Sequence, residues 1–196
     1  MQRLSLLLLL VLGCATTQPS ETPSASGARG DAADAGAKAT AAGASGPSAT
    51  ASIEPRSDST LTGTSQWTTV DGGLGAHVEV QGAAPGLHGV HVHEKGDCSD
   101  PKALSAGPHY NPNMGAHHGG PATPVRHGGD LGNIQVDSSG KGILDVVVTD
   151  VSVDDPANGV VGRAIVVHEK TDDLQTDPAG NSGARIGCGV IQRSTP

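Results

Sequence analysis

Aromatic residues are almost absent from this chain: among 196 residues there is one Trp, one Tyr and no Phe. A hydrophobic core must therefore be built from aliphatic side chains, and Val, Ile and Leu cluster after about residue 60. Basic residues are also scarce, with 12 Lys and Arg against 20 Asp and Glu and a formal net charge of −8. Because nucleic-acid recognition depends on basic patches, nucleic acid is not an expected partner.

No apolar run is long enough to span a bilayer as a helix. Residues 4–12 form an apolar run broken only by Ser5, whereas a spanning helix needs about 20 residues. With Arg3 before it, the run is typical of an export signal. It ends in Val11-Leu12-Gly13-Cys14, which resembles a bacterial lipobox. We expect residues 1–13 to be a lipoprotein signal peptide and Cys14 to be lipidated; the alternative is a plain secretory signal with a chance cysteine.

Cysteine is rare as well, with three in the chain. If Cys14 carries lipid, Cys98 and Cys188 remain as a pair. An exported protein occupies a compartment in which disulfides persist, so we expect the two to be joined. Two unrelated buried thiols are the alternative.

The segment that follows Cys14 has too few apolar residues to fold by itself. From residue 15 to about residue 47 the chain is almost entirely Ala, Gly, Ser, Thr and Pro. Such a composition cannot offset the entropy of ordering. We therefore expect residues 14–47 to form a lipidated cysteine followed by a flexible tether to the membrane, and residues 48–196 to form one folded domain.

Within that domain, segments with strand chemistry alternate with turn signals, and no convincing amphipathic helix is present. This pattern predicts an all-β fold, an antiparallel Greek-key sandwich or barrel of about eight strands. Two stretches, about 95–132 and 169–186, are too long for hairpin turns and are expected to be functional loops. The predicted strands are 49–53, 61–70, 75–81, 89–94, 133–136, 142–149, 162–168 and 187–192.

Nine His in so short a chain direct attention to metal. His91 and His93 are two apart on a predicted strand, so both rings point the same way. With His168 they form an imidazole-only set, which suits copper. The first long loop adds three imidazoles and one carboxylate, a set that suits a closed zinc site. Those four residues are His109, His118, His127 and Asp130.

Around these ligands the sequence resembles copper/zinc superoxide dismutase, in its bacterial, exported lipoprotein form. The motifs follow the family order through nearly the whole domain. They are Gly86-Leu87-His88-Gly89-Val90-His91-Val92-His93-Glu94, Ser105-Ala106-Gly107-Pro108-His109-Tyr110-Asn111-Pro112, His118-Gly119-Gly120-Pro121, His127-Gly128-Gly129-Asp130-Leu131-Gly132-Asn133, residues 166–174, and Gly183-Ala184-Arg185-Ile186-Gly187-Cys188-Gly189-Val190-Ile191.

The resemblance implies one copper and one zinc per subunit and assigns a role to each ligand. Copper would be bound by His91, His93, His109 and His168, and zinc by His109, His118, His127 and Asp130. His109 would bridge the metals, and Asp172 would bond one ligand from each. Arg185 would be the cation beside the copper, and Cys98 and Cys188 would form the family disulfide.

Three further histidines are not expected to be ligands. His88 matches a packing and hydrogen-bonding position, and His77 is expected to face solvent. His117 is an alternative to His118, but the Gly-Gly-Pro that follows favours His118. Two features depart from the familiar animal enzymes: the segment from Asp172 to Arg185 is shorter and lacks a lysine-containing stretch, and Cys98 lies earlier in its loop.

The implied activity is conversion of superoxide to dioxygen and hydrogen peroxide by alternating one-electron chemistry, with His109 as proton carrier and Arg185 holding the anion. The protein would protect the cell envelope or periplasm, attached to a membrane through Cys14. A homodimer is left open. The alternatives are a non-catalytic copper- and zinc-binding protein of the same fold, and a zinc hydrolase, which needs an open zinc position.

Overall fold

A computed structural model describes residues 48–195; the expected signal peptide, Cys14 and the tether lie outside the described residues. No helix in this part of the chain is long and apolar enough to cross a membrane. The elements are β1 (Ser48–Pro55), β2 (Thr62–Val70), β3 (Gly73–Gln81), β4 (Gly86–His93), the 3-10 helix η1 (Leu104–Ala106), β5 (Asp130–Val136), β6 (Lys141–Val148), β7 (Ala164–His168), β8 (Arg185–Val190) and β9 (Gln192–Arg193).

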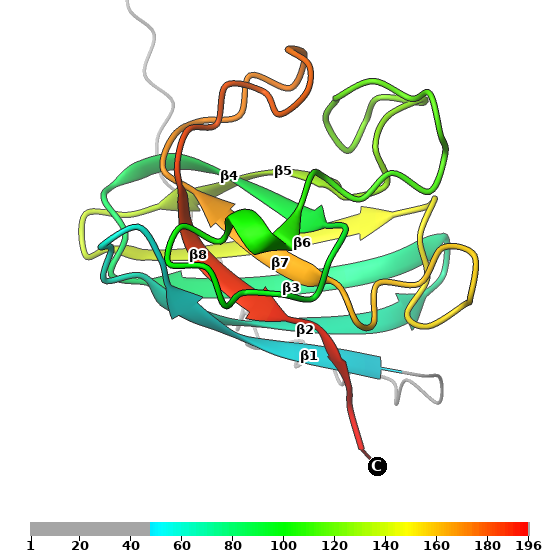
Figure 1. Cartoon of the computed structure of the whole chain (residues 1–196), viewed down its shortest axis with the longest axis horizontal. Coiled ribbons are helices and arrows are strands. Elements are labelled where there is room, and N and C mark those ends of the chain that lie inside the picture. Colours follow the sequence, from blue (N-terminus) through cyan, green and yellow to red (C-terminus); the bar gives the residue numbers. More distant parts are fainter. Residues whose placement is uncertain (1–47, 196) are drawn as a thin grey trace, which may run out of the picture. The chain divides into compact units, whose positions relative to one another are not determined.

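The first eight strands close into an antiparallel barrel. Their order is β1-β2-β3-β6-β5-β4-β7-β8, and β8 pairs again with β1, while the short β9 extends the pairing of β1 (Figure 1). Because β3 leads to β4 across the barrel and β6 returns beside β3, the connection is of the Greek-key type. The predicted all-β, eight-stranded Greek-key fold is confirmed, and each predicted strand overlaps an observed one.

Strand alternation fills the barrel with aliphatic side chains. Along β3, Leu74, Ala76, Val78 and Val80 are buried, and the residues between them are more exposed. The single Trp of the chain, Trp67 on β2, is fully buried in this core. Its indole Nε1–H donates to Ser65 Oγ at 2.9 Å, which satisfies its polar atom inside the barrel.

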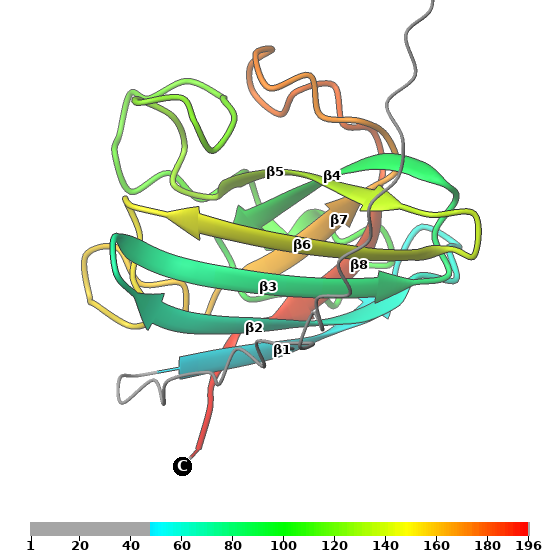
Figure 2. The ribbon, with the colours of Figure 1, turned by 180° about the vertical axis from the view of Figure 1, so that it is seen from behind.

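Three long connections leave the barrel. The connections 94–129 and 169–184 were expected, and parts of both extend from the same side of the barrel in two opposite views (Figures 1 and 2). The third, 149–163, was not among the long loops expected from the sequence. It packs against the first, because Arg126 pairs with Asp150 at 2.6 Å.

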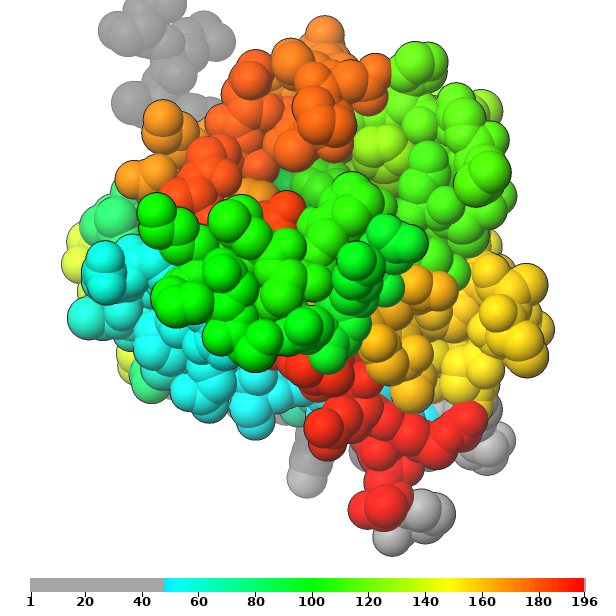
Figure 3. Space-filling model, in the orientation of Figure 1, coloured from blue at the N-terminus to red at the C-terminus, as the bar shows by residue number. Residues whose placement is uncertain are grey.

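A second, smaller apolar cluster lies outside the barrel. It consists of Ala103, Ala106, Ala164, Val166 and Cys188 with Cys98 against it. Ala164 and Val166 belong to β7, whose five residues are all buried, so the usual alternation between a core face and a solvent face is lost there. The first long connection therefore covers the outer face of β7, and Figure 3 shows this green segment in front of the barrel.

Candidate metal centre

The strands place three histidines on the outer face of the barrel, beneath the long connections. On β4, Val90 and Val92 belong to the barrel core, so His91 and His93 point to the opposite side. Neighbouring β7 pairs antiparallel with β4 and ends in His168, on the same face as Val166. The predicted pairing of His91 with His93 on one face follows from this alternation.

Four rings meet in one buried group: those of His91, His93, His109 and His168, with one ligand atom from each within 4.8 Å of the others. The Nε2 atoms of His93 and His168 are 3.4 Å apart. His93 Nδ1 donates to Gly107 O at 2.8 Å and His168 Nδ1 to Gly183 O at 3.3 Å. These bonds place the ring protons on Nδ1, so that both Nε2 lone pairs converge.

A second buried group contains His91, His109, His118 and Asp130, again within 4.8 Å. Asp130 Oδ1 lies 2.8 Å from His109 Nδ1 and 3.2 Å from His118 Nδ1. His127 is outside this tight group, but its Nδ1 lies 3.4 Å from Asp130 Oδ2. The three histidines expected at zinc therefore lie around the Asp130 carboxylate, and both His91 and His109 take part in the two groups.

Asp172 connects the two groups. Its Oδ2 accepts from His91 Nε2 at 2.8 Å and its Oδ1 from His118 Nε2 at 2.7 Å. Asn133 binds the same residue on both sides, since its Nδ2 donates to Asp172 O and its Oδ1 accepts from Asp172 N. Carboxylates in this position fix the tautomer and orientation of metal-binding imidazoles. Asn133 was quoted in a motif but was not expected to have a role.

Four buried ring nitrogens in this site have no hydrogen-bond partner. Leaving buried polar atoms unpaired is costly, and a cluster of them indicates a missing partner. Here the partner would be a cation held by imidazole nitrogens, with one carboxylate on the Asp130 side, and this donor set fits copper and zinc. The atoms are His91 Nδ1, His109 Nε2, His118 Nδ1 and His127 Nδ1.

Burial keeps the first group of rings neutral. It lowers the pKa of His91 and His93, and it lowers that of His168 to about 3. His118 differs: burial lowers its pKa, but the nearby carboxylates of Asp130 and Asp172 outweigh this and raise it to about 10. Neutral imidazole is the form that binds metal, so the His93–His168 side is prepared for a ligand role.

Arg185 begins β8 and lies half-buried next to the first group. Its Nη1 donates to Ala103 O at 2.7 Å and its Nη2 to Gly107 O at 2.8 Å. Burial lowers the pKa of this guanidinium while Asp100 raises it, and an arginine stays charged at any working pH. The two carbonyls hold a fixed positive charge beside the four rings.

The remaining histidines have other partners. His88 is buried and bonds two carbonyl oxygens, those of His168 and Ala84, at 2.8 Å each. The His117 side chain is 82% exposed and bonds Asp177 rather than entering the site. His77 lies on the outer face of β3 and bonds Asp145 and Glu79. The register that favoured His118 over His117 matches this arrangement.

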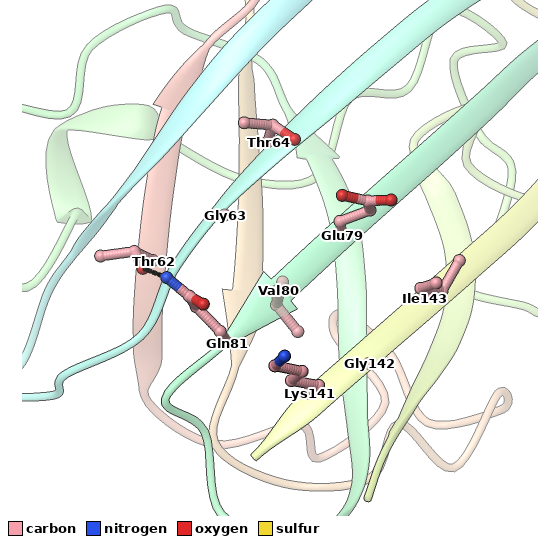
Figure 4. A pocket seen from close by; sticks show the side chains of 9 residues that line it. All are labelled: Thr62, Gly63, Thr64, Glu79, Val80, Gln81, Lys141, Gly142 and Ile143. Atoms are coloured by element: carbon pink, nitrogen blue, oxygen red, sulfur yellow. Dashed lines mark hydrogen bonds between the residues drawn. The ribbon is translucent and has the colours of Figure 1, made fainter. Parts of the chain in front are cut away.

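One hollow on the surface lies away from these rings. It is a groove of about 500 Å³ on the outer face of β2, β3 and β6, lined among others by Thr64, Glu79 and Lys141 (Figure 4). None of the expected site residues lines it, so it has no part in the metal chemistry.

A disulfide joins Cys98 in the first connection to Cys188 on β8, 90 residues later. The carbonyl of Cys98 accepts a hydrogen bond from Arg56 Nε at 2.9 Å. The disulfide therefore attaches the first long connection, whose carbonyls accept hydrogen bonds from Arg185, to β8, the strand that begins with Arg185.

An eight-stranded antiparallel barrel with two buried histidine groups on its outer face, which share His91 and His109, defines a two-metal protein. Residues 61–191 match the family described as copper/zinc superoxide dismutase (SODC). The chain is 46% identical over 146 residues to a Drosophila melanogaster protein named extracellular superoxide dismutase [Cu-Zn], covering 69% of this chain and 78% of that one. A crystal structure of the clock protein EA4 is similar with a TM-score of 0.66 and 39% identity, covering 74% of this chain and 93% of that one.

The chain belongs to the copper/zinc superoxide dismutase family. It is an oxidoreductase that converts superoxide to dioxygen and hydrogen peroxide, and its cofactors are copper and zinc. Family membership, activity and cofactors expected from the sequence are confirmed.

Proposed function

We propose that the two histidine groups divide the cofactors as the sequence motifs imply. His91 Nδ1, His109 Nε2 and the Nε2 atoms of His93 and His168 would hold copper. His109 Nδ1, His118 Nδ1, His127 Nδ1 and Asp130 would hold zinc. The observation that carries this proposal is the set of four buried ring nitrogens without hydrogen-bond partners, each belonging to one of these histidines.

When bound, copper supplies the one-electron redox step and zinc supplies a fixed charge. The chain's own residues orient the imidazole rings and carry a proton. Asp172 holds the rings of His91 and His118 through their Nε2–H groups, so their Nδ1 atoms face the metals. His109 Nε2 would take up a proton between the two half-reactions and return it to the forming peroxide. A second proton would come from solvent water, so that two superoxide anions and two protons give one dioxygen and one hydrogen peroxide.

Arg185 would bind the substrate anion. Its guanidinium is held by Ala103 O and Gly107 O before any substrate arrives, so no reorganisation is needed when charge moves. Gly107 O also accepts from His93, which places this cation next to the copper ligands.

Replacing one ligand from each group tests the division. His93→Ala should remove copper and nearly all activity, whereas His127→Ala should mainly lower zinc occupancy and stability. Metal content is measured by mass spectrometry beside superoxide consumption. Equal loss of both metals from each variant would contradict the assignment.

We also propose that the enzyme works outside the cytoplasm, attached to a membrane through Cys14, and defends the cell envelope. Three observations support export: the apolar run 4–12 before Cys14, the Cys98–Cys188 disulfide, and a relative named extracellular. Residues 14–47 would be the tether and 48–196 the catalytic domain. Cys14→Ser should abolish lipid labelling and membrane association; a variant that stays on the membrane would contradict the anchor.

A homodimer is a further proposal that can be tested. The segments 161–162 and 190–191 lie together, with Gly162 N donating to Ile191 O at 2.9 Å, and we propose them as a homodimer face. Sedimentation of the domain 48–196 measures its mass directly, and a monomer at micromolar concentration would contradict a stable dimer.

A further inference from the structure

Arg185 depends on two carbonyl groups of the first long connection, and only one of them is fixed by a copper ligand. Gly107 O accepts from both His93 and Arg185. Ala103 O, the other acceptor, is presented by a residue in the left-handed conformation, with φ 54° and ψ 24°. A residue with a Cβ reaches this conformation only at a cost in free energy, so neighbouring bonds must compensate for it.

Asp100 supplies those bonds. Its Oδ1 accepts from Lys102 N at 2.8 Å and from Leu104 N at 3.0 Å, the residues on either side of Ala103. Its own carbonyl accepts from Ala103 N at 2.8 Å. One aspartate therefore binds three consecutive backbone amides, and the direction of the Ala103 carbonyl follows from them.

The same turn is fastened at its far end. Asp100 N donates to Ser105 Oγ at 3.2 Å, and that hydroxyl donates to Asp97 O at 2.9 Å. The Ala103 methyl packs with Ala106 and Cys188 in the small outer cluster. The disulfide holds the loop in place, but the Cys98 carbonyl itself bonds Arg56 and not Arg185.

We propose that Asp100 is a positioning residue for superoxide dismutation: by holding the 102–104 turn it aims the Ala103 carbonyl at Arg185 and so fixes the guanidinium that receives the anion. This rests on the role proposed above for Arg185. The action runs through hydrogen bonds of the carboxylate oxygen; the charge of Asp100, which also attracts the guanidinium, is the competing cause that the variants below separate.

Three variants of the full, metal-loaded enzyme separate these effects. Asp100→Ala removes the acceptor, and Asp100→Asn keeps an acceptor oxygen but removes the charge. Asp97→Ala is the matched control, because Asp97 Oδ1 accepts from Ser99 N at 2.9 Å in the same loop, whereas the amides of Lys102 and Leu104 donate to Asp100. The readouts are the rate constant, the dissociation constant of azide as a substitute anion, and metal content.

Asp100→Ala should lower the rate and weaken azide binding by about threefold or more with both metals retained, while Asp100→Asn and Asp97→Ala stay within about twofold of the parent. A loss in Asp100→Asn equal to that in Asp100→Ala would overturn the proposal, since charge would then be responsible. So would an equal loss in Asp97→Ala, because general loosening of the loop would then explain the effect.

A double-mutant cycle keeps this inference distinct from the role of Arg185. In an Arg185→Ala background, Asp100→Ala should cause no further loss, because its effect passes through the guanidinium. An unchanged rate in Arg185→Ala alone would refute the proposed function of Arg185. A slow Arg185→Ala beside an unaffected Asp100→Ala would refute only the positioning role.

A readout without copper completes the test. In the zinc-loaded, copper-free protein, the Arg185 guanidinium protons should exchange slowly in the parent and in Asp100→Asn, and rapidly in Asp100→Ala, as followed by NMR. Should Asp100→Ala fail to fold, Asp100→Glu displaces the carboxylate by one methylene and must show the same rapid exchange. Unchanged exchange in a folded variant that lacks the acceptor would overturn the proposal.

Discussion

His93 and Arg185 donate hydrogen bonds to the same atom, the carbonyl oxygen of Gly107, at 2.8 Å each. One backbone group thus sets both the orientation of His93, a proposed copper ligand, and the position of the cation proposed to bind superoxide. Gly107 has a positive φ of 76°, a conformation that glycine reaches without strain. If Arg185 binds the anion and His93 binds copper as proposed, the two are coupled through the loop as well as through the metal.

Removing the guanidinium should lower the rate of superoxide dismutation without loss of the metals. We expect Arg185→Ala to keep both metals and to lose at least about tenfold in rate, equivalent to about 1.4 kcal/mol of transition-state stabilisation. The rate of Arg185→Lys should lie between those of the parent and Arg185→Ala, because an ammonium group cannot donate to both carbonyls in the geometry of the guanidinium. Pulse measurements of superoxide decay with metal analysis check this; a fully metallated, full-rate alanine variant would remove Arg185 from the mechanism.

Ionic strength tests how an acidic protein attracts an anion. From Ser48 onward the domain has nine Lys and Arg against seventeen Asp and Glu. Charges more than about 8 Å apart are largely screened at physiological salt, so charges near the copper should matter most. Arg185 lies beside the histidine rings, and we expect Lys170, whose stem contacts Gly183, to contribute as well. We expect the rate to fall as salt is added; a steady rise would show that net charge dominates.

Gly180 should be indispensable to the bridge between the two metal sites. A Cβ built there would overlap Asp172 Oδ1 and come within 2.6 Å of His118 Nε2. Gly180→Ala should therefore displace Asp172 and lower the occupancy of both metals. Gly72→Ala is the control, because Gly72 also has a positive φ but open space around it. Equal metal content in the two variants would contradict this reading of the site.

The free energy of unfolding of the metal-free domain should be largest near pH 6.5, because histidine in an unfolded chain has a pKa of about 6.5. His91, His93 and His168 have folded-state pKa values below it, so the unfolded chain binds more protons and stability falls toward acid. For His168 this continues to about pH 3. His118, with its pKa raised to about 10, stabilises below pH 6.5 and loses that contribution as the pH rises toward 10.

Urea unfolding of the chelator-treated domain across this range measures the effect. A decline on both sides of the maximum is the expected result. Stability that increases steadily from pH 7 to 4 would contradict the lowered pKa values of the buried rings.

Much of the molecule could be predicted from its sequence because the signals were local. Alternation of apolar residues located the strands, and the two-residue spacing of His91 and His93 placed both rings on one face. The 149–163 connection was missed as a long loop because its short apolar stretches around Val151 and Val160 resemble strand ends; in the structure both residues are buried in the core without belonging to a strand.

What the sequence could not give were contacts made by backbone atoms. The carbonyls of Ala103 and Gly107 have no residue-type signature, yet they hold Arg185. Asn133 appeared as one polar residue in a strand, and its two bonds to Asp172 exist only because β5 lies beside the 169–184 connection. Such roles depend on three-dimensional proximity, which composition and spacing do not encode.

Because aromatic residues are scarce, the tryptophan fluorescence of this enzyme comes from a single residue. Trp67 is the single indole of the chain, fully buried and bonded to Ser65. Its fluorescence therefore arises from one site inside the barrel, with no second tryptophan to average over. Loss of a ligand at the outer face should leave that emission nearly unchanged, while opening of the barrel should shift it to longer wavelength. The emission wavelength of Trp67 can thus distinguish loss of a metal ligand from unfolding of the barrel in every variant described above.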